Sequence, residues 1–357
     1  MHTFRLMTAS LAVAATTAAL VAAPSSADKP GSGSSTGSGQ IFMVNPVQSS
    51  GDQGLTDSKD ANTPELAAQY TTAELRNLDG TGYLSGKWVN VRTSTGTPAY
   101  SSTNTFVYTR DQDQFEQVMG YFWVNQAQEY LQSLGFRPGG PFKPILARPY
   151  DLRINQYGVD NSYMTDKGDY IRLGKGGVDD AEDAEVIMHE YGHAIHADQV
   201  PGFYDTGSID AGAIGESFGD YFGVSAGLAA AAQYGWPVNA AEACPMDWDS
   251  TSYTNAPHCI RRFDLNLTLA DRRNQVHYDG QIWSQALWEI RLGYRDLGKS
   301  TAAWDTTLIK SQFDYAPGTS FQDAARTTYR EALARDGKRA ADLVLKRFAA
   351  RGITFAP

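Results

Sequence analysis

The strongest constraint on this chain is the run HEYGH at residues 189–193, an HExxH motif. Residues four positions apart lie on one face of a helix, so His189 and His193 can present two imidazole nitrogens to one metal ion. Glu190 then lies beside such an ion rather than among its ligands. Asp179 precedes the motif as a candidate N-cap, and the pattern predicts a helix of roughly 18 residues.

A candidate third ligand follows in the run GAIGESFGD at residues 212–220. Catalytic zinc commonly keeps three protein ligands and one open position. Glu216 offers the third ligand from a second predicted helix, and Asp220, one turn later, can hydrogen-bond a ligand histidine from behind. The alternative is that two histidines and a glutamate share a helix by chance, and the downstream glutamate makes that alternative the weaker one.

Together the two runs resemble the gluzincin metalloproteases, in particular the fungalysin and thermolysin-like families. The similarity extends from about residue 111 to the end of the chain. It implies an α+β fold with a β-rich N-terminal lobe, a mainly helical C-terminal lobe and the zinc helix between them. It also implies a zinc-dependent endopeptidase, in which His189, His193 and Glu216 bind Zn²⁺ and Glu190 is the general base that activates water.

The resemblance assigns further residues to the reaction and to the substrate backbone. His277, in the run VHYDGQIW, is similar to the histidine that hydrogen-bonds the tetrahedral intermediate, and Tyr204 is its predicted partner. Asn161 and Ser162 match a segment that holds the backbone of the substrate. Residues 170–173 are predicted to form an edge strand to which a peptide substrate could add by backbone hydrogen bonds.

Two more residues are assigned to substrate binding by the same resemblance. Arg261 matches an arginine that contacts a substrate carbonyl, although an ordinary surface arginine is an equally good interpretation. Val186, one turn before His189, matches the position that lines the pocket for the residue after the scissile bond. Apolar side chains line this pocket in thermolysin-like enzymes, so a preference for hydrophobic residues is implied.

The composition of the N-terminal residues predicts that the protein is exported and that its folded region begins after a signal peptide and a linker. Residues 1–27 have one charged side chain, an apolar run and a small-residue cleavage site, as in a secretory signal peptide. Residues 28–39 are predicted to be a disordered linker. Residues 40–110 are β-rich and are either a short pro-segment or the start of the mature enzyme, which we favour. The zinc-motif lobe is placed at 111–205 and the helical lobe at 206–357.

The two cysteines and the net charge limit the compartment in which the protein acts and the partners that it can bind. Cys244 and Cys259 are the only cysteines of an exported chain and are predicted to form a disulfide. The formal net charge is −10, which argues against nucleic acid or anionic membranes as partners. We expect a secreted monomer that acts on peptide or protein substrates. Ca²⁺ is possible but not indicated, because no motif closes a calcium loop.

Two alternative functions are compatible with the same residues. Another zinc hydrolase, such as an aminopeptidase, could use the same ligands, although no glycine-rich motif for a free amino terminus is present. An inactive binding protein on the same fold is the other alternative. Loss of Glu190 would be the simplest route to such a protein, and Glu190 is present.

Overall fold

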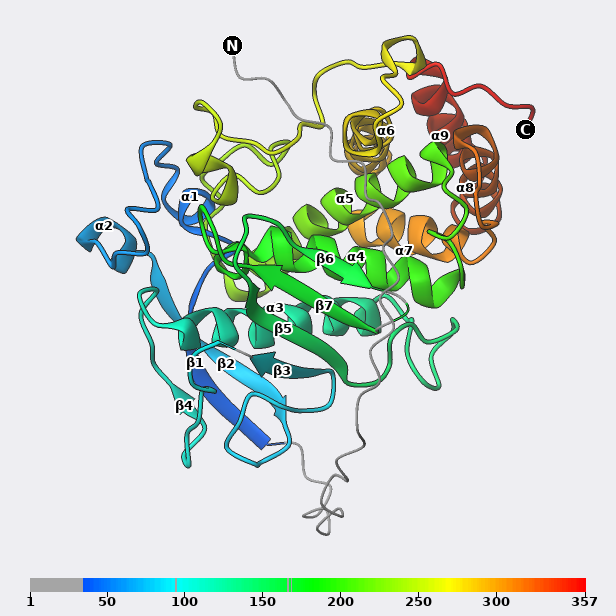
Figure 1. The fold of residues 1–357 in the computed structure, drawn as a ribbon. Coiled ribbons are helices and arrows are strands. Elements are labelled where there is room, and N and C mark those ends of the chain that lie inside the picture. Colours follow the sequence, from blue (N-terminus) through cyan, green and yellow to red (C-terminus); the bar gives the residue numbers. More distant parts are fainter. Residues whose placement is uncertain (1–34, 94, 166, 168) are drawn as a thin grey trace, which may run out of the picture. The chain divides into compact units, whose positions relative to one another are not determined.

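The computed structural model describes residues 35–357 apart from residues 94, 166 and 168 (Figure 1). The predicted signal peptide and residues 28–34 of the predicted linker lie outside the described residues. Strands fill much of the first half of the described chain, and helices fill the second half. The strands are β1 (Ser35–Phe42), β2 (Tyr70–Leu78), β3 (Val89–Thr93), β4 (Thr105–Phe106), β5 (Tyr150–Tyr157), β6 (Tyr163–Thr165) and β7 (Tyr170–Gly174).

The first two helices are short, and all the later α-helices are longer than these two. The α-helices are α1 (Pro46–Ser50), α2 (Pro64–Ala67), α3 (Asp113–Ser133), α4 (Ala184–Gln199), α5 (Ile209–Tyr234), α6 (Val276–Asp296), α7 (Thr301–Gln312), α8 (Phe321–Asp336) and α9 (Lys338–Ala350), and the short 3₁₀ turns are Asp180–Glu182, Asp249–Ser252 and Leu269–Asp271. No helix in the described part of the chain is long and apolar enough to cross a membrane.

The strands form two sheets. One has the order β2-β1-β4, and the other has the order β3-β5-β7-β6, in which β6 is antiparallel to β7 and the other pairs are parallel. The prediction that residues 170–173 form an edge strand is wrong, because β7 is paired on both sides. The edge is β6 instead. Local sequence patterns predict a strand but not its place in the order of the sheet.

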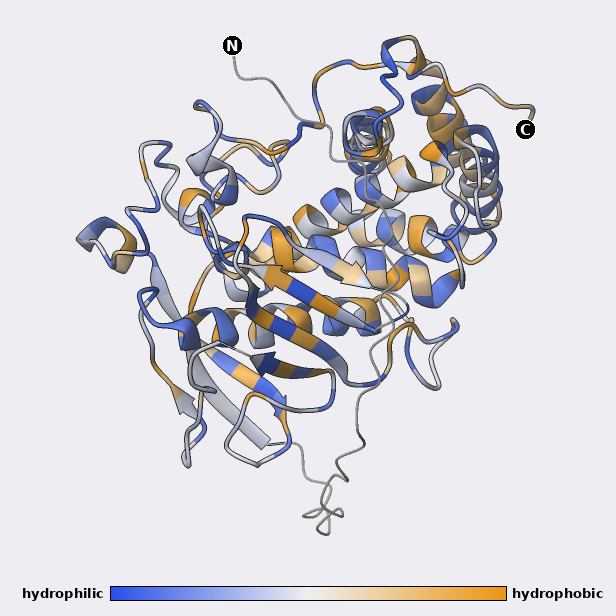
Figure 2. Cartoon of the chain, viewed as in Figure 1, coloured by the Kyte–Doolittle hydropathy of each residue, from blue (hydrophilic) through white to orange (hydrophobic). Residues whose placement is uncertain are grey.

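Helix α3 and the strands form the core that supports the zinc-motif helix. Helix α3 contacts β1 and β2 of the first sheet, β3 and β5 of the second, and helices α4 and α5. The colours of β5 and β7 alternate along each strand in Figure 2, as expected when successive side chains point to opposite faces. Their apolar residues Leu152, Ile154, Ile171 and Leu173 are fully buried in one large hydrophobic cluster.

The HExxH helix begins later than predicted. The side chain of Asp183, not Asp179, caps α4 and accepts a hydrogen bond from the backbone N–H of Glu185 at 2.9 Å. The backbone N–H of Ala184 donates to the carbonyl of Val44 at 3.0 Å, so the N-terminal region fixes this helix start. A contact so distant in sequence cannot be seen in a local capping pattern.

The other departure is at the start of the described chain. Strand β1 begins at Ser35 and pairs with β2 from that residue, so residues 35–39 are not a disordered linker as predicted. Glycine and serine tolerate a strand when neighbouring strands pair with it on both sides. The predicted fold class is confirmed, since sheets occupy the N-terminal part, helices the C-terminal part, and the HExxH motif lies on α4.

Candidate active site

The site begins with a close contact between α4 and α5. A Cβ atom on Gly192 of α4 would lie 2.8 Å from the Cα atom of Gly219 on α5. Helix α5 starts at the Ser208 cap, whose hydroxyl accepts from the N–H of Ala211 at 3.2 Å. Because only glycines stand at the crossing, the two backbones touch and the side chain of Glu216 reaches the HExxH histidines.

The three predicted metal ligands converge. The Nε2 atoms of His189 and His193 lie 3.0 Å apart, and the Glu216 carboxylate oxygens lie 3.4 Å from His189 Nε2 and 3.6 Å from His193 Nε2. Two unprotonated nitrogens this close repel one another unless a proton or a cation lies between them. Glu216 Oε2 is buried, and no described residue forms a hydrogen bond of normal geometry with it, although Nε2 of His189 and Nε2 of His277 lie 3.4 and 3.2 Å away. Two imidazoles and one carboxylate therefore fit a divalent metal.

The protonation of these groups agrees with a cation site. Burial lowers the pKa of His193 to about 4, so this ring is neutral near pH 7. Burial opposes a proton on His189, but hydrogen bonds to Asp220 and Glu216 outweigh it and raise the pKa of His189 to about 10. Burial likewise opposes charge on Glu216, yet the histidines hold its pKa well below the usual value. The pocket thus favours one positive charge beside a carboxylate.

Both ligand histidines are held from behind. His189 Nδ1 lies 2.8 Å from Asp220 Oδ1, as predicted from the spacing of Glu216 and Asp220. His193 Nδ1 lies 2.9 Å from the hydroxyl of Tyr204. These contacts turn both Nε2 atoms toward Glu216, because each ring has its other nitrogen occupied. The contact of Tyr204 with His193 was not predicted, since the residues come from different segments.

Arg261 lies behind His189. Its Nε and Nη2 atoms are 2.6 and 2.5 Å from the two carboxylate oxygens of Asp220. Arg261 also lines the cleft, and its contact with Asp220 occupies two of its guanidinium nitrogens. The arginine therefore fixes the carboxylate that fixes His189, and its predicted contact with a substrate carbonyl remains a prediction.

Glu190 lies beside the ligands and is buried. It accepts a hydrogen bond from the backbone of Met164 in β6, and its Oε2 atom has no partner within the described residues. His189, Glu190 and His193 offer ligand atoms that all lie within 4.8 Å of one another. Burial raises the pKa of Glu190 to about 7, partly offset by the positive charge of His189. A carboxyl group of this pKa can take up and release a proton near neutrality.

His277 enters the site from the first turn of α6. Its Nε2 atom lies 3.2 Å from Glu216 Oε2, and its side chain is 51% exposed at the cleft. The side-chain amide of Gln275 lies 3.0 Å from Nδ1. If the amide donates there, the neutral ring carries its proton on Nε2, which faces the cleft as a hydrogen-bond donor.

The cleft in front of these groups has a volume of about 490 Å³. The predicted substrate residues Asn161, Ser162 and Val186 all line it, together with Tyr163 and Met164 of the edge strand. Sequence reasoning missed six other lining residues, which are Asp160, Asp180, Met246, Asp249, Tyr253 and Ile260. Three of these six, Met246, Asp249 and Tyr253, come from a loop without regular motifs, and only its cysteines marked it as ordered.

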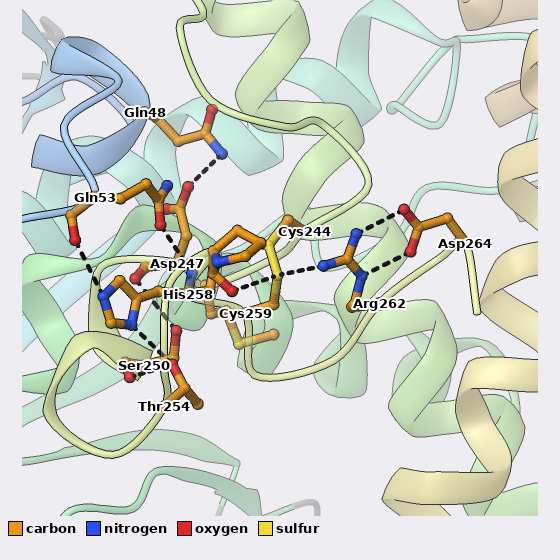
Figure 3. Close-up of a disulfide and its surroundings, with 12 residues drawn as sticks. Gln48, Gln53, Cys244, Asp247, Ser250, Thr254, His258, Cys259, Arg262 and Asp264 are labelled. Carbon is orange, nitrogen blue, oxygen red and sulfur yellow. Dashed lines mark hydrogen bonds and ion pairs between the residues drawn. A yellow bond between two sulfur atoms is a disulfide. The ribbon is translucent and has the colours of Figure 1, made fainter.

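That loop is closed by the predicted disulfide. Cys244 and Cys259 are bonded, with Cα atoms 5.1 Å apart (Figure 3). Inside the loop, His258 is buried, and its Nδ1 lies 2.9 Å from the Thr254 hydroxyl. The backbone N–H of His258 donates to Gln53 at 2.8 Å. The loop is therefore fixed at its ends and against the N-terminal region.

His196 is not among the converging ligands, although its Nδ1 lies 3.5 Å from the hydroxyl of Tyr204. It lies one turn beyond His193 on α4, is fully buried, and stacks on Phe218 with ring centroids 4.6 Å apart. Burial lowers the pKa of His196 to about 3, so the ring is neutral. It packs in the core, while the metal ligands converge elsewhere.

The fold and the site define a metallopeptidase with an HExxH helix. The fungalysin metallopeptidase family matches residues 101–312, more than half of the chain, and the chain belongs to this family. The predicted family and enzyme class are therefore confirmed.

Comparison with solved structures agrees at the level of the fold. The precursor of protealysin, a metalloproteinase from Serratia proteamaculans, matches with a TM-score of 0.53 and 16% sequence identity. The match covers 74% of this chain and 87% of that chain. The search of curated proteins found no significant match.

Proposed function

We propose that this chain is a secreted endopeptidase that binds one zinc ion and hydrolyses internal peptide bonds. The observation that carries the proposal is the convergence of His189 Nε2, His193 Nε2 and the Glu216 carboxylate, with Glu190 beside them in an open cleft. Two imidazoles and a carboxylate are the donor set expected of catalytic zinc with a free position. When bound, zinc supplies a Lewis acid that polarises a carbonyl and lowers the pKa of water.

Glu190 is assigned the proton transfers. As the carboxylate it takes a proton from the attacking water, and as the acid it gives this proton to the leaving amine. A pKa of about 7 suits both steps, because the two protonation states are then similarly populated at neutral pH. The hydrogen bond from Met164 orients the carboxylate toward the cleft.

His277 and Tyr204 are assigned to the oxyanion. His277 faces the cleft with Nε2, and burial lowers its pKa, so a neutral ring donates a hydrogen bond rather than a full charge. The hydroxyl of Tyr204 also lines the cleft while it contacts His193. Preorganised donors of this kind stabilise the charge that develops on the carbonyl oxygen.

The substrate backbone is assigned to the edge strand β6 and the segment before it. Met164 pairs with β7 on one side of β6, and the other side borders the cleft. An extended peptide can add to such an edge by backbone hydrogen bonds. Asn161 and the carbonyl of Ser162 are the proposed contacts. The Ser162 hydroxyl is already engaged, since it accepts from the N–H of Gly174 at 3.1 Å.

We also assign residues 40–110 to the mature enzyme rather than to a pro-segment. Arg110 is fully buried and its guanidinium contacts Glu182 at 2.8 to 3.1 Å, immediately before α4. Val44 accepts the hydrogen bond from Ala184. Removing these residues would free the start of the HExxH helix. Export is supported by the composition of residues 1–27 and by the disulfide, which forms in oxidising compartments.

The test uses peptides blocked at both ends and the full secreted protein loaded with zinc. An endopeptidase cleaves the blocked peptides, loses activity with a chelator and regains it with zinc. Cleavage of free amino-terminal peptides alone would show an aminopeptidase. A protein that binds one zinc per chain and cleaves neither kind of peptide would refute the proposal.

A further inference from the structure

One side of the cleft carries three carboxylates outside the metal site. Asp160, Asp180 and Asp249 offer oxygen atoms that all lie within 4.8 Å of one another, and all three residues line the cleft. Asp180 is only 3% exposed and Asp249 only 4% exposed, whereas Asp160 lies at the surface. The reaction assigned to Glu190 and the metal ligands uses none of these residues.

The two buried members of the group lack a basic partner. Asp180 accepts a hydrogen bond from the Ser162 hydroxyl, and Asp249 Oδ2 accepts one from the Tyr253 hydroxyl at 2.6 Å. Asp249 Oδ1 is buried without any partner within the described residues. Among residues 35–357 without 94, 166 and 168, no Lys, Arg or His forms an ion pair with the three carboxylates. The basic residue of the same cleft, Arg261, is paired with Asp220.

This arrangement favours a bound cation, because the two buried carboxyl groups have no basic residue beside them as a counter-ion when they ionise. Burial raises the pKa of Asp180 to about 7, and repulsion from Asp160 adds to it. Burial also raises the pKa of Asp249 well above its usual value, and Asp180 contributes to the shift. A buried carboxylate without a counter-ion is costly, so such groups are normally paired with a cation.

The carboxylates lie on the side of the cleft where Glu190 acts. Val186 and Glu190 are four residues apart on α4, so they are neighbours on one face of the helix. Asp180 is close enough for the charge of Glu190 to raise its pKa. Since Glu190 is assigned to give its proton to the leaving amine, the residue that carries this amine lies beside Val186. Its side chain then points into the pocket formed by Val186, Asp180 and Asp249.

The geometry points to a pocket that takes the side chain of lysine or arginine as the residue immediately after the scissile bond. This inference rests on the proposed function and specifies its substrates. Val186, Met246 and Ile260 supply apolar walls for the methylene groups, and Asp180 and Asp249 receive the charged end. The sequence implied a preference for hydrophobic residues from Val186 alone. With the carboxylates of Asp180 and Asp249 in the same pocket, a preference for lysine or arginine replaces it.

The pocket has the rigidity that selection of a long side chain requires. Met246, Asp249 and Tyr253 all belong to the loop that the disulfide closes. The backbone N–H of Asp249 donates to Asp183 at 3.2 Å, and the N–H of Met246 donates to Glu185 at 2.6 Å. The loop between Cys244 and Cys259 is thus attached to the start of α4, the helix that carries the two ligand histidines.

The test measures cleavage of peptides that are blocked at both ends and differ only after the scissile bond, where they carry Lys, Arg, Leu or Glu. We expect kcat/KM for Lys and Arg to exceed that for Leu by about tenfold or more, because a site with buried charges rejects a substrate that leaves them unpaired. Asp249→Asn and Asp180→Asn should each reduce this ratio to within about threefold of unity. The matched control Asp342→Asn removes one exposed carboxylate of α9 and should leave the ratio unchanged.

A binding measurement separates this inference from the proposed function. Glu190→Gln protein, titrated with the same peptides, should bind the Lys peptide about tenfold more tightly than the Leu peptide, and Asp249→Asn in this background should remove the difference. Thermal unfolding checks that each variant is folded, and Asp180→Asn replaces Asp249→Asn if the latter is not.

Three outcomes would overturn the inference. Preferred cleavage before Leu, with a ratio that the Asp249 and Asp180 variants do not alter, would refute it while the proposed function stands. Stoichiometric calcium binding that is lost in Asp249→Asn, without a preference for Lys, would show that the group is a metal site. No cleavage of any peptide by the zinc-loaded protein would refute the proposed function and the inference with it.

Discussion

The two glutamates of the site differ in their assigned role, and exchanging each for glutamine tests that assignment. Glu190→Gln keeps the shape of a buried side chain whose carboxylate accepts from Met164 and has one oxygen without a partner. Glu216→Gln keeps one of the two oxygens, which now lie 3.4 Å from His189 Nε2 and 3.6 Å from His193 Nε2, but removes the negative charge. Both variants should fold, because neither changes the volume of the core.

The expected magnitudes follow from these positions. A positioned general base contributes a factor of roughly 10²–10⁴, or about 3–5 kcal/mol of the barrier, so Glu190→Gln should lose that much of kcat. Its three ligands are intact, so zinc should stay near one per chain. Loss of a hydrogen-bond partner behind a ligand weakens metal binding about 10–100-fold, and loss of the Glu216 charge should exceed this.

The assay combines metal content by mass spectrometry with hydrolysis of a blocked peptide, with and without added zinc. Excess zinc should restore part of the activity of Glu216→Gln and none of the activity of Glu190→Gln. If Glu190→Gln lost its zinc while Glu216→Gln kept both metal and activity, the assignment of base and ligand would be wrong. Asp220 would then be the first carboxylate to examine as a ligand.

Three further predictions concern the surroundings of the site. Tyr204→Phe removes the hydroxyl that holds His193 and should weaken zinc binding about tenfold in a competition with a chelator. Arg110→Met leaves Glu182 buried without its counter-ion and should lower the free energy of unfolding by about 3–5 kcal/mol in urea denaturation, whereas an unchanged midpoint would contradict the pairing. The pKa of Asp180 is raised from 3.8 to about 7, so ionising this carboxyl group costs folding free energy, and the cost builds up as pH rises from about 4 to 7. Asp180→Asn should therefore stabilise the protein by roughly 1–3 kcal/mol at pH 8 and less at pH 5, and equal gains at both would contradict an unpaired charge.

The parts of the site that lie on helices could be predicted from sequence. His189 and His193, and Glu216 and Asp220, are each one turn apart, and helical spacing places each pair on one face regardless of the rest of the fold. The close approach of the two helices is made at Gly192 and Gly219.

The parts that depend on contacts distant in sequence could not be predicted. Asp180 and Asp249 meet only because the loop 244–259 folds over the start of α4. The same is true of the capping residue Asp183, which a bond from Val44 helps to place, and of β7, whose position inside the sheet depends on β6. Periodicity reports which face a side chain occupies and carries no information about which distant segment lies opposite.

The contact between Gly192 and Gly219 has a consequence for residues that bind nothing themselves. Main-chain atoms of α4 and α5 approach one another there, so a Cβ atom on Gly192 would lie 2.8 Å from the Cα atom of Gly219. A Cβ atom on Gly219 would lie 2.7 Å from His189 Nδ1, the nitrogen that contacts Asp220. A methyl group at either position would therefore have to displace a helix or the ring of His189, and the site would lose its geometry although no ligand residue had changed.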